Sequence, residues 1–299
     1  MGKLRIIMPL PFKSFSTFDV PTWYFDDTSC LETIYDEDFS AFYRDELDEF
    51  YKAAIDVRTS CIYVQEIKEK DFEEIARRTA IQFKYVLNGF SLDKSIAIPF
   101  AGLVEFEDKA HIQKILDLEP STNLHSLRKK EFKIRPETEP ATVSDFYKIV
   151  SKCCTKNKTL LFTLDRFNSS LIRDNFQDRV VDITISLESL ISGKDELRFK
   201  FALYNSFISE SSAEDRWKAF ELFSALYDAR SGIVHGENNS KANQKVAENW
   251  DEIVKNARAS LNYHLLYLNQ KSRESWDEHL KHLVFGKTVR IVEQTGEVQ

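Results

Sequence analysis

One segment of the 299-residue sequence places a permanent cation where a helix would otherwise be apolar. Within Glu221–Asn239, Arg230 continues a stripe that also contains Phe223, Tyr227 and Val234, at spacings of three and four residues. A guanidinium in this position must be paired, face a cleft or lie in an interface, because burying it alone is costly. Its planar fork is well suited to binding a phosphate.

A titratable side chain follows Arg230 closely. His235 lies five residues later, roughly 140° around a helix at 100° per residue. The two side chains are therefore not stacked, but both can border one groove where the helix ends at Gly236. Histidine is the usual general acid or base near neutral pH, so this pair could stabilise charge and move a proton.

The spacing of this pair is not distinctive by itself. Arg258/His264 and Arg273/His279 show a similar spacing. The sequence contains no GxGxxG, Walker A, HExxH or GxSxG motif. His279 and His282 could touch a metal, but no acidic or cysteine cluster completes a site, so we expect no metal and no cofactor.

The helix that must carry the pair has clear start and stop signals. Ser212, with Asp215 three residues later, predicts its beginning, and Gly236 predicts its end after Val234. A second apolar stripe makes this helix apolar most of the way round, and we expect it to be central in its domain. The second stripe consists of Leu222, Leu226, Ala229 and Ile233.

Helical periodicity dominates the chain after residue 135 and predicts an all-α domain over residues 136–299. One helix is expected to begin at Thr142. The other expected helices are Leu160–Arg173, Asp178–Ile191, Glu196–Ile208, the Ser212-capped helix to Val234, and Val246–Leu268.

Residues 1–135 show a mixed pattern that predicts an α+β domain of unknown role. The boundary is placed in the charged, proline-containing stretch Leu127–Pro140. Runs rich in β-branched and aromatic residues predict strands, and two amphipathic stretches predict helices. The strands are Lys3–Leu10, Cys61–Ile67 and Ser95–Phe106, and the helices are Tyr35–Ile55 and Asp71–Leu87.

The net charge of −7 excludes bulk electrostatic attraction to nucleic acid, so any RNA contact must be local. One basic stretch could provide it, although a solvated charged surface is an equal alternative. This stretch contains Arg128, Lys129, Lys130 and Lys133. Cys153 and Cys154 lie at helical core spacing. No signal peptide or membrane-spanning segment is found, so we expect a cytoplasmic protein without membrane contact.

The context of Arg230 and His235 resembles the HEPN superfamily, whose signature is Arg, four to six residues, then His near a helix end. The wider resemblance is to the ApeA-like HEPN group of prokaryotic defence proteins, and it covers about a third of the chain, residues 160–267. The similar stretches are LDRFNSSLIRDNFQDRVVDITISLESLI, LRFKFA and LYDARSGIVHG. The resemblance implies that the all-α domain is a HEPN helical bundle.

The resemblance also implies a metal-independent endoribonuclease that acts as a homodimer, with Arg230 and His235 as catalytic residues. Ser231 and Asn238 could orient the phosphate, although Asn238 is as readily a turn residue. The long helix contributes two acidic positions, Asp182 and Glu188. Either could pair with Arg230 or Arg198; we favour Glu188 as the orienting partner of Arg230, with a purely structural role as an equal alternative.

Three functions stay open. The first is a ribonuclease acting on tRNA or mRNA in antiviral defence, with residues 1–135 sensing a phage-derived trigger or restraining the nuclease. The second is a non-catalytic HEPN module for dimerisation or for binding a nucleotide or RNA. The third is a toxin held by a separate antitoxin. Intact Arg230, Ser231 and His235 favour the first.

Overall fold

The computed structural model describes residues 2–9, 22–24, 29–32, 60–67, 72–90, 102–106, 109–116, 140–191, 196–236, 240–271 and 275–287. The chain divides into two compact units, Met1–Ser151 and Lys152–Gln299, and each is considered by itself. Within the described helices, none is long and apolar enough to cross a membrane.

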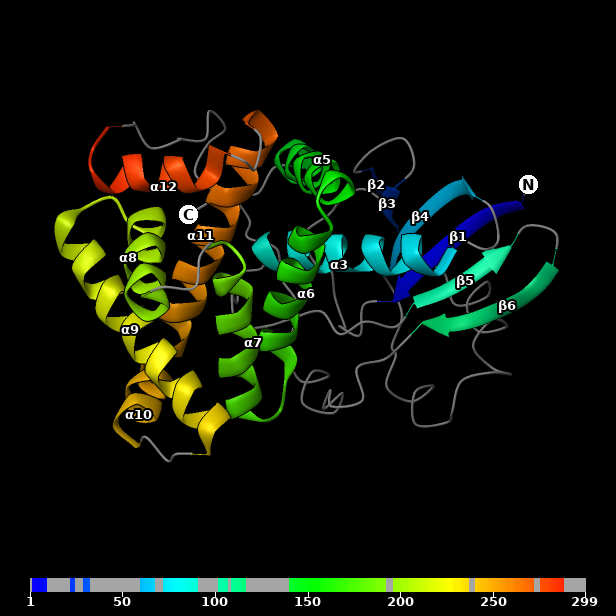
Figure 1. The fold of residues 1–299 in the computed structure, drawn as a ribbon. Helices are drawn as coiled ribbons and strands as arrows, with labels where there is room; N and C mark the ends of the chain where they lie inside the picture. The colour runs from blue at the N-terminus through cyan, green and yellow to red at the C-terminus, as the bar shows by residue number, and fades with distance from the viewer. Residues whose placement is uncertain are drawn as a thin grey trace. The chain divides into compact units, whose positions relative to one another are not determined.

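Strands in the first unit form an antiparallel sheet with the order β2-β3-β4-β1-β5-β6 among the described residues (Figure 1). The central strand β1 pairs with β4, where Ile6 faces Tyr63, and with β5, where Ile6 faces Val104. The strands are β1 (Gly2–Pro9), β2 (Thr22–Tyr24), β3 (Ser29–Glu32), β4 (Ser60–Ile67), β5 (Gly102–Phe106) and β6 (Lys109–Leu116).

Two helices contribute an aromatic core to the first unit. Helix α3 (Phe72–Phe90) continues past the predicted end at Leu87, because its buried face extends to Phe90. Helix α5 (Pro140–Lys156) meets it where the rings of Phe83 and Tyr147 stack at 4.8 Å. The division between the two units falls within α5.

Several predictions fall on residues outside those that the structure describes. They include the helix Tyr35–Ile55, the start of the strand Ser95–Phe106, and nearly all of the boundary stretch Leu127–Pro140. The α+β assignment of residues 1–135 and the domain limits therefore stay predictions.

The second unit is all-α in its described part, as the helical periodicity predicted (Figure 1). After the last turn of α5, its helices are α6 (Lys158–Ile172), α7 (Phe176–Glu188), α8 (Leu197–Ser209), α9 (Ala213–His235), α10 (Ser240–Glu248), α11 (Trp250–Gln270) and α12 (Trp276–Val284).

Two elements differ from the sequence expectation. The stretch predicted as one helix from Val246 to Leu268 belongs to two helices, α10 and α11, because Asn249 interrupts it by donating from its side chain to the Lys245 carbonyl oxygen at 2.8 Å. Helix α12 was not predicted. It packs through Trp276, Leu280 and Leu283, and the Trp276 indole donates to the Leu190 carbonyl oxygen at 2.6 Å.

Helix α9 has the predicted ends. The Ser212 hydroxyl accepts from the Asp215 backbone N–H at 3.0 Å, and Gly236 closes the helix with a φ of 71°. The helix contacts α7, α8, α10 and α11, but Trp217 and Val234 on it are 64% and 54% exposed, so α9 packs on several helices without being enclosed by them. This packing fixes the direction in which its last two turns, with Arg230 and His235, are presented.

A buried carboxylate ties α6 to α7. Asp182, on α7, accepts from Arg166 Nη1 and from Arg173 Nε, both at 3.0 Å. Its side chain is only 6% exposed, whereas those of the two arginines are 31% and 29% exposed. Asp182 therefore holds the end of α6 against the helix that carries Glu188.

We expect Asp182→Ala to lower the free energy of unfolding by about 3 kcal/mol, because it leaves two half-buried guanidinium groups without their carboxylate. Urea denaturation of the purified variant measures this. Asp145→Ala is the matched control, since Asp145 forms an exposed i,i+3 pair with Lys148 and its loss should cost less than about 1 kcal/mol. Equal losses in the two variants would contradict the assigned role.

Candidate functional site

The structure places Arg230 beside Glu188. Arg230 Nη2 lies 3.7 Å from Glu188 Oε2, which is an ion pair but longer than a hydrogen bond. The Arg230 side chain is 26% exposed and that of Glu188 is 18% exposed. The guanidinium is thus held at the surface of the bundle by a carboxylate from a neighbouring helix, the pairing that the sequence analysis favoured.

This ion pair leaves binding capacity unused. Arg230 Nε and Glu188 Oε1 are buried and make no hydrogen bond within the described part of the chain. The contact between these residues is therefore one long ion pair, and these two atoms have no protein partner in the described residues. A bound anion or a reorientation of Arg230 toward a substrate could satisfy the guanidinium.

Burial dominates the electrostatics around Glu188. Desolvation raises the pKa of Glu188, and the Arg230 charge opposes this only in part. Burial also raises the pKa of Tyr227, and the negative charge of Glu188 adds to that rise. The Arg230 cation therefore lies beside a carboxylate whose charged form is destabilised by burial.

His235 is the last residue of α9 and is exposed, with the left-handed Gly236 directly after it. The neighbouring Val234 is 54% exposed, which is high for an aliphatic side chain. Ser231 is half-buried in the turn between Arg230 and His235. The final two turns of α9 therefore present a cation, a hydroxyl and an imidazole near one helix end.

The remaining acidic candidates are arranged differently. Asp182 pairs with Arg166 and Arg173 rather than with Arg230. Arg198 pairs with Asp228, through hydrogen bonds from Nε at 2.5 Å and from Nη2 at 2.6 Å. Asp182 thus joins α6 to α7, and Arg198 joins α8 to α9.

Asp228 and Tyr227 also lie near Arg230, in the stretch LYDARSGIVHG, but neither was predicted as a site residue. Asp228 anchors α8 to α9 two residues before Arg230, and the Glu188 charge adds to the rise that burial causes in the pKa of Tyr227. Their closeness to Arg230 in the sequence was the available signal. Tyr227 had been assigned only to the apolar stripe of Arg230, and Asp228 pairs with an arginine of another helix, which local spacing does not indicate.

The alternative Arg–His pairs lie elsewhere. Arg258 and His264, on α11, are 5% and 3% exposed, and Arg258 packs over the Phe167 ring at 4.9 Å. Alanine variants of these two residues would lose core packing whatever their chemistry, so a loss of activity in them would not identify a catalytic role. Candidate residues outside the described part are Asn238, Arg273, Arg128, Lys129, Lys130 and Lys133.

His279 belongs to an aromatic cluster. Its Nε2 lies 2.8 Å from the Tyr263 hydroxyl, and its ring stacks with that of Trp276 at 5.7 Å. Burial lowers the pKa of His279. In the described residues, no group of three or more His, Cys, Asp or Glu side chains is arranged to hold a metal ion.

Comparisons with known proteins give no family for the chain. No protein-family model, no curated protein and no solved structure matches it.

The pH dependence of stability tests the surroundings of Glu188. Because its pKa lies above the ordinary value of 4.5, the native state binds more protons than the unfolded state between these two pKa values. Glu188 therefore makes the wild-type protein less stable as the pH rises through that range. We expect Glu188→Gln to remove this loss, so that the variant becomes more stable relative to wild type on going from about pH 4 to about pH 7.

Urea denaturation at several pH values measures this difference. Glu278→Gln is the matched control, because Glu278 is 72% exposed on α12 and solvent screens its i,i+4 pair with His282. A Glu188→Gln variant that loses stability relative to wild type as the pH rises would show that the attraction to Arg230 outweighs desolvation.

Proposed function

We propose that this chain is a metal-independent endoribonuclease of the HEPN type, with Arg230 and His235 as catalytic residues. The observation that carries the proposal is the last part of α9, where a guanidinium with an unused buried Nε lies in the turns that end at an exposed histidine. This arrangement offers charge stabilisation and proton transfer, the two functions that RNA cleavage without a metal requires.

In the proposed reaction the RNA 2′-oxygen attacks the adjacent phosphorus and the P–O5′ bond breaks. A base removes the 2′-hydroxyl proton, and an acid protonates the departing 5′-oxygen. The products are a 2′,3′-cyclic phosphate and a free 5′-hydroxyl. Arg230 would stabilise the negative charge on the phosphate oxygens, and His235 would transfer one of the two protons.

Incubation of the purified protein with total RNA in EDTA tests the function. We expect endonucleolytic fragments with cyclic phosphate ends, and no cleavage of a substrate carrying a 2′-deoxy group at the cleaved position. Inhibition by EDTA, or equal cleavage of the 2′-deoxy substrate, would contradict the mechanism. RNA binding without cleavage would favour a non-catalytic HEPN module.

One Arg230–His235 pair supplies one of the two proton-transfer groups, so we propose that a homodimer brings two pairs into one cleft. Light scattering is expected to give twice the 34.9 kDa mass of the chain. The proposal of a dimer would be contradicted by a stable monomer at micromolar concentration that retains full ribonuclease activity.

The biological role is proposed from the resemblance alone. An effector of antiviral defence would become active on infection, whereas a toxin would be held inactive by an antitoxin. Growth arrest that disappears in His235→Ala is expected in both cases, after infection for the effector and on expression without the antitoxin for the toxin. Rescue by a neighbouring gene product would identify the toxin.

A further inference from the structure

An aromatic ring and an arginine form an exposed pair on α6. Phe162 is 46% exposed, although most large apolar side chains in the described part of this unit are buried. The Arg166 guanidinium, one turn later, lies over the Phe162 ring at 5.3 Å from its centroid. Arg166 Nη1 donates to Asp182 at 3.0 Å, and the Arg166 side chain is still 31% exposed. A flat ring and a flat cation are therefore presented together to solvent.

This pair lies close to the Arg230–Glu188 ion pair. Helix α7 packs against both α6 and α9 (Figure 1). The Thr163 hydroxyl lies 2.5 Å from the Ser189 hydroxyl. The residues that precede these two in the chain are Phe162 on α6 and Glu188 on α7, which are therefore on adjoining turns. Helices in contact are about 8–10 Å apart, so the axes of α6 and α9 lie at most about 20 Å from each other.

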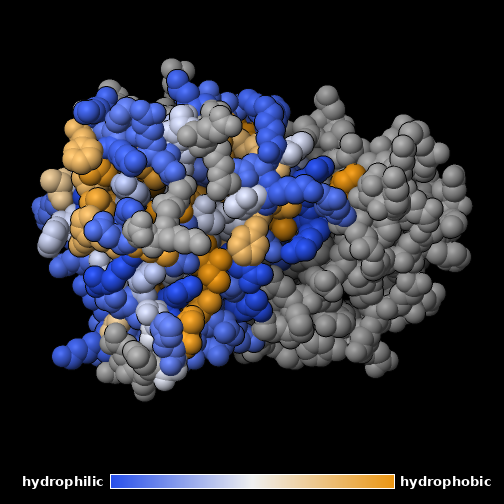
Figure 2. Space-filling model, in the orientation of Figure 1, coloured by the Kyte–Doolittle hydropathy of each residue, from blue (hydrophilic) through white to orange (hydrophobic). Residues whose placement is uncertain are grey.

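The surface between the two pairs is a half-exposed stripe of α7. Val181, Ile185 and Glu188 follow one another at spacings of four and three residues, and each is half-buried, whereas the opposite side of α7 is buried. Arg166 reaches from α6 to Asp182, directly after Val181. Figure 2 shows apolar side chains in a stripe over α7, with hydrophilic residues on both sides. The stripe thus connects the exposed ring on α6 with Arg230 on α9.

The chemistry of this surface favours a nucleic acid strand with unpaired bases. An exposed ring offers a stacking face to any base, and an arginine binds phosphate oxygens and stacks on bases. Bases inside a duplex are stacked on their neighbours and cannot reach such a ring, whereas the bases of a single strand can turn outward. A strand lying across the stripe would meet a cation on each side, Arg166 and Arg230. Asp182 and Glu188 are each paired with an arginine.

We propose that the RNA is single-stranded where it is cut, and that Phe162 and Arg166 hold a base near the cleaved phosphate. The base stacks on the Phe162 ring, Arg166 binds a phosphate of the same segment, and the strand crosses the α7 stripe to Arg230. A stacked strand rises about 3.4 Å per nucleotide, so the distance between α6 and α9 spans no more than about six nucleotides. This inference rests on the proposed ribonuclease function and adds its substrate class and two positioning residues.

Fluorescence anisotropy of the full chain with a short, unstructured 2′-O-methyl RNA tests the inference, because such a strand lacks the attacking hydroxyl and stays intact. We expect Phe162→Leu to weaken binding about tenfold, since it keeps an apolar side chain but removes the stacking face. Phe162→Trp should bind at least as tightly as wild type. The strand annealed to its complement should bind at least about tenfold more weakly than the single strand. Phe285→Leu, at a ring that is 76% exposed beside α12, is the matched control and should bind normally.

Cleavage assays separate this inference from the function on which it rests. In single-turnover cleavage of single-stranded RNA, Phe162→Leu should raise the half-saturating protein concentration about tenfold and leave the rate at saturation unchanged. Cleavage by wild type with unchanged affinity and half-saturation in Phe162→Leu would overturn the inference and leave the function standing. Binding that depends on Phe162 without cleavage of any RNA would contradict the function and support the binding surface. Equal affinity for single strand and duplex, or no saturable binding of the single strand, would overturn the inference.

Discussion

Replacing His235 by alanine is expected to lower the rate of RNA cleavage by about 10²–10⁴-fold, the usual effect of removing a general acid or base. The loss should appear in single-turnover cleavage of a labelled RNA. Because His235 is exposed at the end of α9, its removal leaves no cavity, and the variant should unfold at the same urea concentration as wild type.

His282→Ala is the matched control for this experiment. His282, on α12, is also on the surface, with a side chain that is 42% exposed, and it has no place in the proposed site. We expect wild-type cleavage from it. A His235→Ala variant that keeps full activity would show that α9 does not carry the proton-transfer group.

Arg230→Ala is expected to reduce cleavage by about 10²–10³-fold, since it removes a donor that stabilises the charge of the transition state. Arg230→Lys should also fail, because a point charge cannot replace the two parallel donors of a guanidinium. Folding should be preserved in both, as Arg230 is partly exposed and its contact with Glu188 is long. Single-turnover rates and urea midpoints measured on the same preparations separate chemistry from stability.

Arg77→Ala is the control for the loss of one positive charge, because Arg77 is an exposed residue of α3 in the first unit. We expect this variant to cleave RNA at the wild-type rate. Full activity in Arg230→Lys would show that any cation suffices there. Full activity in Arg230→Ala would remove this residue from the mechanism.

Figure 2 shows one face of the molecule, where hydrophilic residues cover most of the described part and apolar side chains gather in a few places. Several of the exposed apolar side chains lie on α8 and α9. Phe199 is 53% exposed and Trp217 is 64% exposed, and each ring packs against that of Phe220. Neither Phe199 nor Trp217 belongs to the last turns of α9, where the proposed chemistry takes place.

The sequence by itself determined the features that are fixed within one or two helical turns. Ser212 bonds to a backbone N–H three residues later, and Gly236 supplies the positive φ that ends α9, so both ends follow from local chemistry. The sequence also predicted that Arg230 lies on an apolar stripe of its helix, because helical periodicity depends only on spacing. The interruption at Asn249 was missed, since a side chain that competes with the backbone leaves the apolar spacing unchanged.

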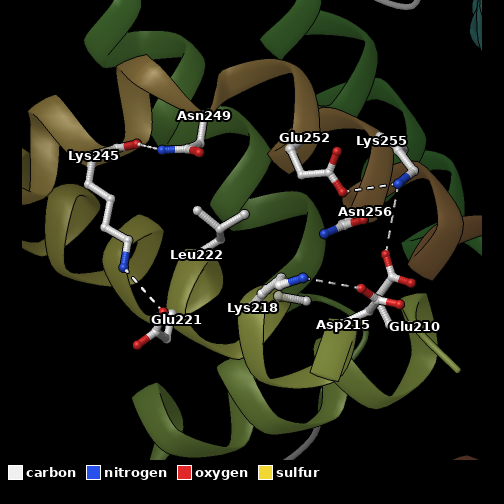
Figure 3. Close-up of a pocket in the computed structure, with 11 residues that line it drawn as sticks. Glu210, Asp215, Lys218, Glu221, Leu222, Lys245, Asn249, Glu252, Lys255 and Asn256 are labelled. Atoms are coloured by element: carbon white, nitrogen blue, oxygen red, sulfur yellow. Dashed lines mark hydrogen bonds and ion pairs between the residues drawn. The ribbon is translucent and has the colours of Figure 1, made fainter. Parts of the chain in front are cut away.

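Only the tertiary structure decided which charges meet. Three ion pairs join residues on different segments: Arg230–Glu188, Arg198–Asp228 and Arg173–Asp182. From the sequence alone, each of these acidic residues could have paired with more than one arginine. A cavity in the second unit is lined by residues from the end of α8 and from α9, α10 and α11, so no local pattern indicates it (Figure 3). The physical reason is that caps and periodicity depend on backbone geometry within a few residues, whereas ion pairs and cavities depend on how whole helices pack.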